Sequence, residues 1–171
     1  KSNLASMGIY VFTAEKLYSY LEKDAQKPDS ENDFGKNVLP DMLTSGEKMT
    51  AYVFDGYWKD VGTIDSLYEA NMDLLGDVPK IDVTDKKWKI QSRNPLMQPQ
   101  YLGKGSKVIN SIVMSGSEIW GEVDNSVLSS GVIVKKGAKV KDSIIMANTV
   151  IEEGATVNYS IIDENTEIGP K

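Results

Sequence analysis

Two side chains in the first half of the chain have the chemistry needed to hold a sugar. Trp58 and Asp60 stand two residues apart in the stretch YWKDVGT, and residues with that spacing share one face of a strand. An indole covers the apolar face of a pyranose, and a carboxylate accepts charge-assisted hydrogen bonds from hydroxyl groups. The spacing alone favours a structural alternative, in which Trp58 is a core aromatic residue and Asp60 a turn or capping residue. The same alternative holds for Asp33, as a helix cap, and for Ser6, a small hydroxyl residue before an apolar run.

The composition excludes several other kinds of catalytic site. The 171 residues contain no histidine and no cysteine, so this chain holds no Ser-His-Asp or Cys-His constellation and no histidine-liganded zinc. Neither GxGxxG nor GxxxxGK[ST] occurs, so it has no glycine-rich phosphate cradle of its own. The net charge of −6 disfavours nucleic acid and anionic membranes as partners. Without a long apolar run or signal-peptide features, the sequence predicts a cytoplasmic location.

The first 78 residues are predicted to alternate strands with helices, as in an α/β domain. Apolar runs predict buried-type strands at residues 7–12, 49–54 and 57–61. Helices are predicted to follow three capping residues, and the second and third to stop at glycines: Thr13, Asp33, Thr63, Gly46 and Gly76. So few strands cannot fill a doubly wound sheet, so we expect residues 1–78 to be only a portion of such a domain.

The second half carries a repeat with a period of 17 residues. Val123, Val140 and Val157 mark the repeat, which also contains a serine and a Gly-Ala pair. Steps of five, six and six residues between aliphatic positions describe three short strands per coil. The sequence therefore predicts a left-handed parallel β-helix of hexapeptide type over residues 102–171, truncated at its C-terminal end. Four aliphatic side chains are predicted to point into its core: Val134, Val140, Ile151 and Val157.

Residues 79–101 are predicted to form a linker between the two halves. Three prolines, Pro79, Pro95 and Pro99, favour an extended and irregular backbone. The segment also contains large side chains, including Trp88 and Met97, so we expect a packed linker rather than a flexible one.

Several motifs together resemble one family. The stretches NLASMGIYVF, DFGKNVLP and GYWKDVGTIDSLYEANMDLL, the junction NPLMQPQYL and the 17-residue coils are similar to the C-terminal part of bacterial glucose-1-phosphate adenylyltransferase, also called ADP-glucose pyrophosphorylase. The resemblance runs over nearly the whole chain and is to the catalytic type of subunit. It implies that residues 1–78 are the C-terminal portion of the nucleotidyltransferase domain.

The resemblance also implies a reaction, in which ATP and α-D-glucose 1-phosphate give ADP-glucose and diphosphate with Mg²⁺. Carried over by motif, six residues would bind glucose 1-phosphate: Ser6, Tyr10, Asp33, Phe34, Trp58 and Asp60. The catalytic groups and the Mg²⁺ ligands would lie upstream of Lys1, so we expect this chain alone to be inactive. The β-helix would build a homotetramer, with or without a related regulatory subunit, and contribute to sites for small-molecule effectors.

Two alternatives stay open at this point. The first is another sugar-phosphate nucleotidyltransferase, and the second is a non-catalytic regulatory subunit or structural solenoid.

Overall fold

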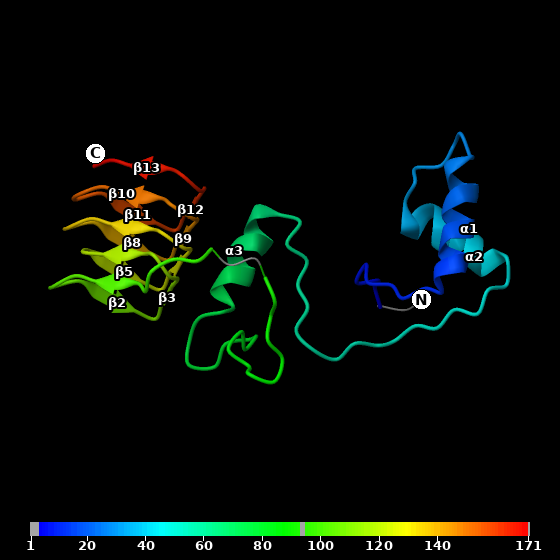
Figure 1. The fold of residues 1–171 in the computed structure, drawn as a ribbon, viewed down its shortest axis with the longest axis horizontal. Helices are drawn as coiled ribbons and strands as arrows, with labels where there is room; N and C mark the ends of the chain where they lie inside the picture. Colours follow the sequence, from blue (N-terminus) through cyan, green and yellow to red (C-terminus); the bar gives the residue numbers. More distant parts are fainter. Residues whose placement is uncertain (1–3, 93–94, 171) are drawn as a thin grey trace. The chain divides into compact units, whose positions relative to one another are not determined.

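The computed structural model describes residues 4–92 and 95–170 (Figure 1). The chain divides into two compact units, Lys1–Asp55 and Gly56–Lys171. The predicted segment limits at residues 78 and 101 follow from motifs rather than from compactness, and they stay predictions. Among the described residues, no helix is long and apolar enough to cross a bilayer.

Unit 1, residues 1–55, is a small helical unit. Helix α1 (Ala14–Ala25) packs against a second helical stretch, formed by the π-helix η1 (Phe34–Val38) and helix α2 (Leu39–Thr44). Its core consists of three buried side chains and two partly buried rings: Tyr20, Val38, Met42, Phe12 and Phe34. The helical stretch predicted after Asp33 is thus confirmed, with its first turn wound as a π-helix.

The predicted helix ends of unit 1 are confirmed at two of three positions. Asp33 caps η1, since its Oδ1 accepts a hydrogen bond of 2.8 Å from the Lys36 backbone N–H. Gly46 follows α2 with φ of +75°, a conformation that favours glycine. Thr13 occupies the N-cap position of α1, but its hydroxyl caps no backbone N–H. Glu15 in the first turn supplies the favourable charge at that end instead.

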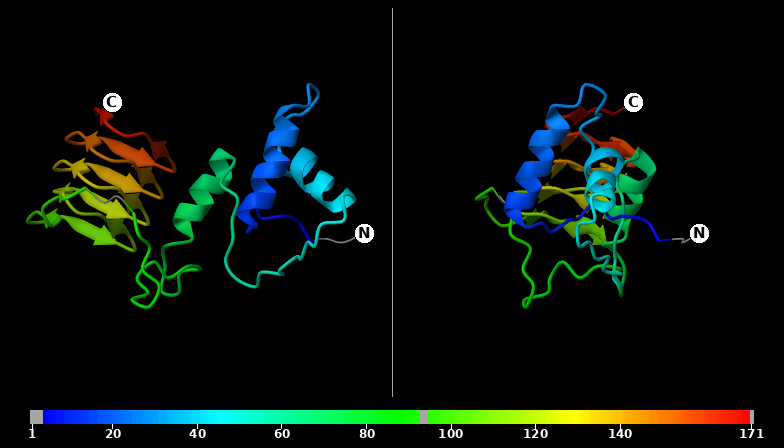
Figure 2. Two further views of the ribbon diagram at one scale, coloured as in Figure 1. Left: turned by 45° about the vertical axis from the view of Figure 1, so that its right-hand side comes forward. Right: turned by 90° about the vertical axis from the view of Figure 1, so that its right-hand side faces the viewer.

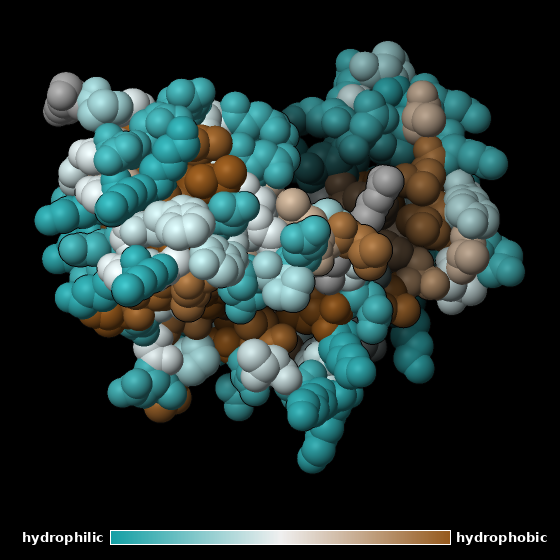
Figure 3. All heavy atoms as spheres, turned by 60° about the vertical axis from the view of Figure 1, so that its left-hand side comes forward, coloured by the Kyte–Doolittle hydropathy of each residue, from teal (hydrophilic) through white to brown (hydrophobic). Residues whose placement is uncertain are grey.

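The three strands predicted before residue 62 are wrong. Residues 7–12, 49–54 and 57–61 have no ladder partner in the described chain, and their backbones are irregular or extended. A strand needs a neighbour to receive its backbone hydrogen bonds, and these apolar runs find none here. Their side chains reach the surface as a result: Val11 is 98% and Tyr52 86% exposed. Hydrophobic residues, drawn in brown, are visible on the face shown in Figure 3.

Unit 2 begins with an extended segment and helix α3 (Ile64–Met72). The predicted start of α3 is confirmed by a capping box, in which Thr63 accepts from the Ser66 backbone N–H and Ser66 accepts from that of Thr63. The helix ends earlier than the apolar pattern suggests, with Asp73 at its C-cap. Gly76 follows with φ of +96°.

The rest of unit 2 is a parallel β-helix, as predicted (Figures 1 and 2). The five-stranded sheet contains β1 (Tyr101–Leu102), β4 (Glu118–Ile119), β7 (Ile133–Val134), β10 (Val150–Ile151) and β13 (Glu167–Ile168). One four-stranded sheet contains β2 (Lys107–Ile109), β5 (Glu122–Asp124), β8 (Lys139–Lys141) and β11 (Thr156–Asn158). The other contains β3 (Ile112–Val113), β6 (Val127–Leu128), β9 (Ile144–Ile145) and β12 (Ile161–Ile162).

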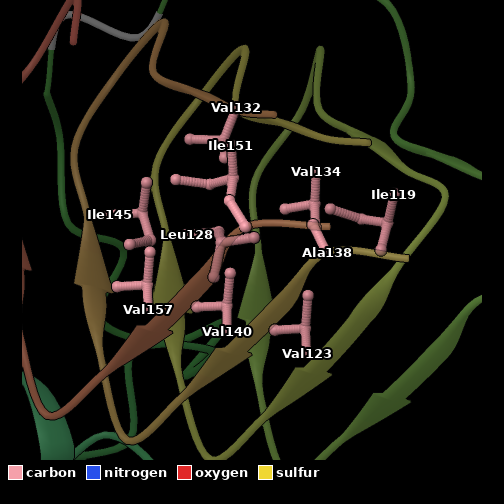
Figure 4. Packing of buried hydrophobic residues seen from close by; sticks show 11 residues of the cluster. Ile119, Val123, Leu128, Val132, Val134, Ala138, Val140, Ile145, Ile151 and Val157 are labelled. Atoms are coloured by element: carbon pink, nitrogen blue, oxygen red, sulfur yellow. The ribbon is translucent and has the colours of Figure 1, made fainter. Parts of the chain in front are cut away.

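The predicted register of the repeat is confirmed by the strand pairing. Val123, Val140 and Val157 are direct neighbours on β5, β8 and β11 and are 1%, 1% and 4% exposed. Val134 and Ile151 are completely buried in the same core, which Figure 4 shows from close by. Each coil thus adds apolar side chains to a continuous column, and this burial drives the stacking.

The serine of the repeat joins successive coils. The Ser126 hydroxyl accepts from the Ser143 backbone N–H at 3.0 Å and donates to the Asp124 carbonyl at 2.7 Å. Ser143 repeats the arrangement one coil later, with the Ser160 N–H and the Lys141 carbonyl. Ser126 and Ser143 are fully buried, and a hydroxyl both donates and accepts, so serine satisfies two backbone groups inside the wall.

One coil is shorter than the others. The corner between β4 and β5 holds two residues, Trp120 and Gly121, whereas the corner between β7 and β8 holds four. A Cβ on Gly121 would lie 2.3 Å from the Ala138 carbonyl oxygen, so the corner closes tightly on the next coil. The Trp120 ring lies 5.1 Å from the Tyr101 ring and directly against Gly103. The short corner explains why the first block of the repeat is irregular.

Helix α3 is fastened to one corner of the β-helix. Asn110, Asn125 and Asp142 stack there with φ between 40° and 46°, and their side chains form a ladder with hydrogen bonds of 2.7 Å. The Tyr68 hydroxyl donates to the Asp142 carbonyl at 2.7 Å, and the Gly76 N–H donates to Asn110 Oδ1 at 2.9 Å. The corner therefore fixes the position of α3 within unit 2.

The linker region packs unevenly on unit 2. Trp88 is 83% exposed, whereas Met97 lies against the coils close to Gly116 and Gly131. Contact with the β-helix is thus made near the C-terminal end of residues 79–101.

Candidate functional site

The four candidate sugar-binding residues of unit 1 lie in one neighbourhood. The Ser6 hydroxyl lies 3.0 Å from the Tyr10 hydroxyl, and it accepts from the Gly8 backbone N–H at 3.2 Å. The Tyr10 ring stacks on the Phe34 ring, with 5.8 Å between centroids and 27° between planes. Asp33 precedes Phe34 directly, so the turn that begins η1 joins all four residues.

Asp33 plays the structural role that its sequence context allows. Its Oδ1 caps η1 through Lys36, and its own backbone N–H donates to Asn37 Oδ1 at 3.2 Å. No described residue forms a hydrogen bond to Asp33 Oδ2. One carboxylate oxygen thus holds the local backbone while the other is open to a further donor.

The two candidate residues of unit 2 lie on an extended segment, residues 56–62, ahead of α3. Trp58 is 46% exposed and Asp60 is exposed, whereas Tyr57 and Lys59 between them are half-buried. The alternation is that of a strand, so the exposed pair shares a side of the segment although no sheet forms. The alternative in which Trp58 is a core aromatic residue is therefore wrong.

Asp60 is a turn residue as well as a candidate ligand. Its Oδ1 accepts from the Gly62 backbone N–H at 3.0 Å, which bends the chain towards Thr63 and the start of α3. A Cβ on Gly62 would approach Oδ1 to 3.2 Å, closer than most such contacts. No described residue forms a hydrogen bond to Asp60 Oδ2. The turn alternative is confirmed, and it leaves one charged acceptor unused.

The opposite side of the segment is held by charges that the sequence reasoning missed. Asp73 Oδ2 accepts from the Tyr57 hydroxyl at 3.0 Å and from Lys59 Nζ at 3.4 Å, and Oδ1 accepts from Lys80 Nζ at 2.6 Å. Lys59 also pairs with Glu69 Oε2 at 2.6 Å. The hydrogen bond from Lys80, followed by those from Tyr57 and Lys59, lowers the pKa of Asp73 below its ordinary value. Burial first, and then the bond to Asp73, raises the pKa of Tyr57.

A signal for this network was present in the sequence. An acidic residue at the C-terminal end of a helix faces the negative end of the helix dipole, which is unfavourable without a cation nearby. Asp73 stands at that position on α3. Its position therefore predicts a basic partner, which Lys59 and Lys80 provide.

The described residues offer no evident metal centre. Among residues 4–92 and 95–170, no group of three or more acidic side chains is placed to hold a metal ion. The donor set of this chain therefore does not fit Mg²⁺, and we derive no step through that ion here.

Comparisons with known proteins identify the two halves. Residues 1–76 match the family model described as nucleotidyl transferase, and residues 97–171 match the model described as GlmU-like, C-terminal hexapeptide. With the β-helix and the segment ahead of α3, these matches define the class: part of a nucleotidyltransferase domain followed by a hexapeptide-type β-helix.

The curated relatives narrow this class. The glucose-1-phosphate adenylyltransferases of Clostridium beijerinckii, Bacillus cereus and Bacillus cytotoxicus are 51%, 53% and 54% identical to the chain, over 141, 140 and 140 residues. Each comparison covers 82% of this chain and 36% or 37% of the relative, so the chain spans little more than a third of their length. Over the compared residues, the chain belongs to the glucose-1-phosphate adenylyltransferase family.

Proposed function

We propose that this chain supplies the glucose 1-phosphate side of the active site of a glucose-1-phosphate adenylyltransferase, which forms ADP-glucose and diphosphate from ATP and α-D-glucose 1-phosphate. The similarity to enzymes of that name carries the proposal. The exposed pair Trp58 and Asp60 supports it, because an uncovered indole beside an unengaged carboxylate oxygen suits a pyranose ring.

The proposed chemistry needs no nucleophile from this chain. A phosphate oxygen of glucose 1-phosphate attacks the α-phosphorus of ATP in line, and the protein contributes by aligning the two substrates. Trp58 would cover the sugar and Asp60 Oδ2 would accept from its hydroxyls. Ser6, Tyr10, Asp33 and Phe34 would contribute polar and aromatic contacts from unit 1.

The rest of the enzyme completes this proposal. The part of the relatives that this chain does not match would bind ATP and Mg²⁺. The β-helix would serve in assembly as a homotetramer, with or without a regulatory subunit, and in binding small-molecule effectors. The cytoplasmic location predicted from the sequence stays part of the proposal.

The proposal is tested with a hybrid enzyme, in which this chain replaces the matching segment of the Bacillus cereus relative. The hybrid should form ADP-glucose from ATP, glucose 1-phosphate and Mg²⁺, and it should prefer glucose 1-phosphate to galactose 1-phosphate and mannose 1-phosphate. This chain alone, assayed in parallel, should form none. A folded hybrid without activity, or with a preference for another sugar phosphate, would contradict the proposal and favour one of the two alternatives.

A further inference from the structure

Asp73 is the point at which the contacts of the extended segment converge. Its carboxylate is 10% exposed and accepts from three side chains, those of Tyr57, Lys59 and Lys80. The Lys80 backbone N–H also donates to the Asp73 carbonyl at 3.0 Å. An acid in this environment is held by specific partners rather than by water.

These contacts supply what the missing sheet does not. Residues 56–62 form no ladder with any strand of the described chain, so backbone hydrogen bonds do not set the direction of their side chains. Tyr57 and Lys59 point to the end of α3, and alternation along the segment then turns Trp58 and Asp60 the other way. The orientation of the exposed pair thus depends on the anchoring of its neighbours.

We propose that Asp73 is a positioning residue for the sugar site: by holding Tyr57 and Lys59 on α3, it orients Trp58 and Asp60 towards the sugar. The inference rests on the proposed function for what the pair faces. The anchoring itself concerns this chain alone and can be tested without turnover.

Asparagine at position 73 cannot replace the acid. Two carboxylate oxygens accept from three donors, whereas an amide has one acceptor oxygen and an NH₂ group that would face a lysine or the tyrosine hydroxyl. The change also removes the charge that the two lysines share. Asp73→Asn therefore releases at least one of Tyr57 and Lys59 while leaving the volume of the side chain nearly unchanged.

The first experiment is fluorine NMR of this chain labelled with fluorotryptophan. The chain has three tryptophans, and Trp58→Phe assigns the signal of Trp58. Asp73→Asn should shift or broaden that signal and leave the Trp120 signal, which reports the β-helix, in place. Asp65→Asn is the matched control, because Asp65 is exposed in the first turn of the same helix and shares no hydrogen bond with residues 57–59 in the described structure.

The second experiment measures kinetics in the hybrid enzyme. Asp73→Asn should raise the Michaelis constant for glucose 1-phosphate roughly tenfold, since small misplacements of positioning groups cost one to two orders of magnitude. The constant for ATP should change less than about twofold. Tyr57→Phe should cause a smaller rise, and adding it to Asp73→Asn should cause no further loss, because both changes break one interaction. Tyr57→Phe also keeps the test open if the Asp73 variant does not fold.

The two experiments separate the inference from the function on which it rests. An unmoved Trp58 signal in Asp73→Asn would overturn the anchoring, whatever the enzyme does. A moved signal with an unchanged constant for glucose 1-phosphate would overturn the role in the sugar site. If Asp60→Asn, measured beside it, still raises that constant, the proposed function stands; if it does not, the proposed function falls as well.

Discussion

Replacing Asp60 with asparagine separates its two roles. Asn keeps an Oδ1 that can accept from the Gly62 N–H, so the turn into α3 should survive. The change converts Oδ2, which no described residue engages, from a charged acceptor into an NH₂ donor. Only the interaction expected with the sugar hydroxyls should be lost.

The magnitude follows from the kind of bond removed. A hydrogen bond to a charged group contributes about 1.5 to 3 kcal/mol, and about 1.4 kcal/mol corresponds to a factor of ten. In the hybrid enzyme, Asp60→Asn should therefore reduce the use of glucose 1-phosphate by between about tenfold and 150-fold. The Michaelis constant for ATP should change little, and so should the melting temperature.

Asp60→Ala provides the comparison, because it also removes the acceptor for the Gly62 N–H. We expect the same kinetic loss together with a lower melting temperature, by the loss of about 1 kcal/mol of turn stability. Measuring both Michaelis constants and a thermal melt for each variant decides the matter. Equal losses for glucose 1-phosphate and ATP in Asp60→Asn would refute the reasoning and leave Asp60 as a turn residue only.

Three further predictions concern the framework. Val140→Asp would place an unpaired charge at a position 1% exposed, so denaturant unfolding should show a loss of about 3 kcal/mol or more, whereas Lys141→Gln should stay within about 0.5 kcal/mol; equal effects would contradict the register. Gly121→Ala puts a Cβ 2.3 Å from a backbone oxygen and should cost about 1 to 3 kcal/mol, and an unchanged unfolding midpoint would contradict the tight corner. Since its partners lower the pKa of Asp73, its contribution should be complete above about pH 4 and disappear as the pH falls through that lowered pKa; the tryptophan signal that reports residues 57–59 should show this acid transition, and Asp73→Asn should abolish it.

The β-helix was the most predictable part of the fold, because the period of the sequence is also the period of the packing. A residue that faces the core in one coil predicts its counterparts in the next, as Val123 does for Val140 and Val157. The short corner at Trp120 and Gly121 broke the period and was recognised only as an irregular block. Two missing residues leave the core positions intact and change only the corner, so the aliphatic pattern survives.

Unit 1 shows where prediction from apolar runs fails. Residues 7–12 and 49–54 have the composition of buried strands, but composition describes a surrounding that a partner strand must provide. Helix ends were predicted better, because a cap such as that of Asp33 or Thr63 is satisfied within a few residues. The Asp73 network lay between these cases. Its partners at positions 57, 59 and 80 are local in space only once the Asp60 turn has folded the segment back along α3.

Helix α3 links the two parts of unit 2 that matter for function. On one side, Tyr68 and Gly76 bind it to the corner ladder of the β-helix. At its C-terminal end, Asp73 holds the side chains of Tyr57 and Lys59. A short helix is stiff over this length, so its position on the β-helix and the orientation of the segment ahead of it are not independent. Any partner that changes how the corner ladder holds α3 therefore acts on the same element that orients Trp58 and Asp60.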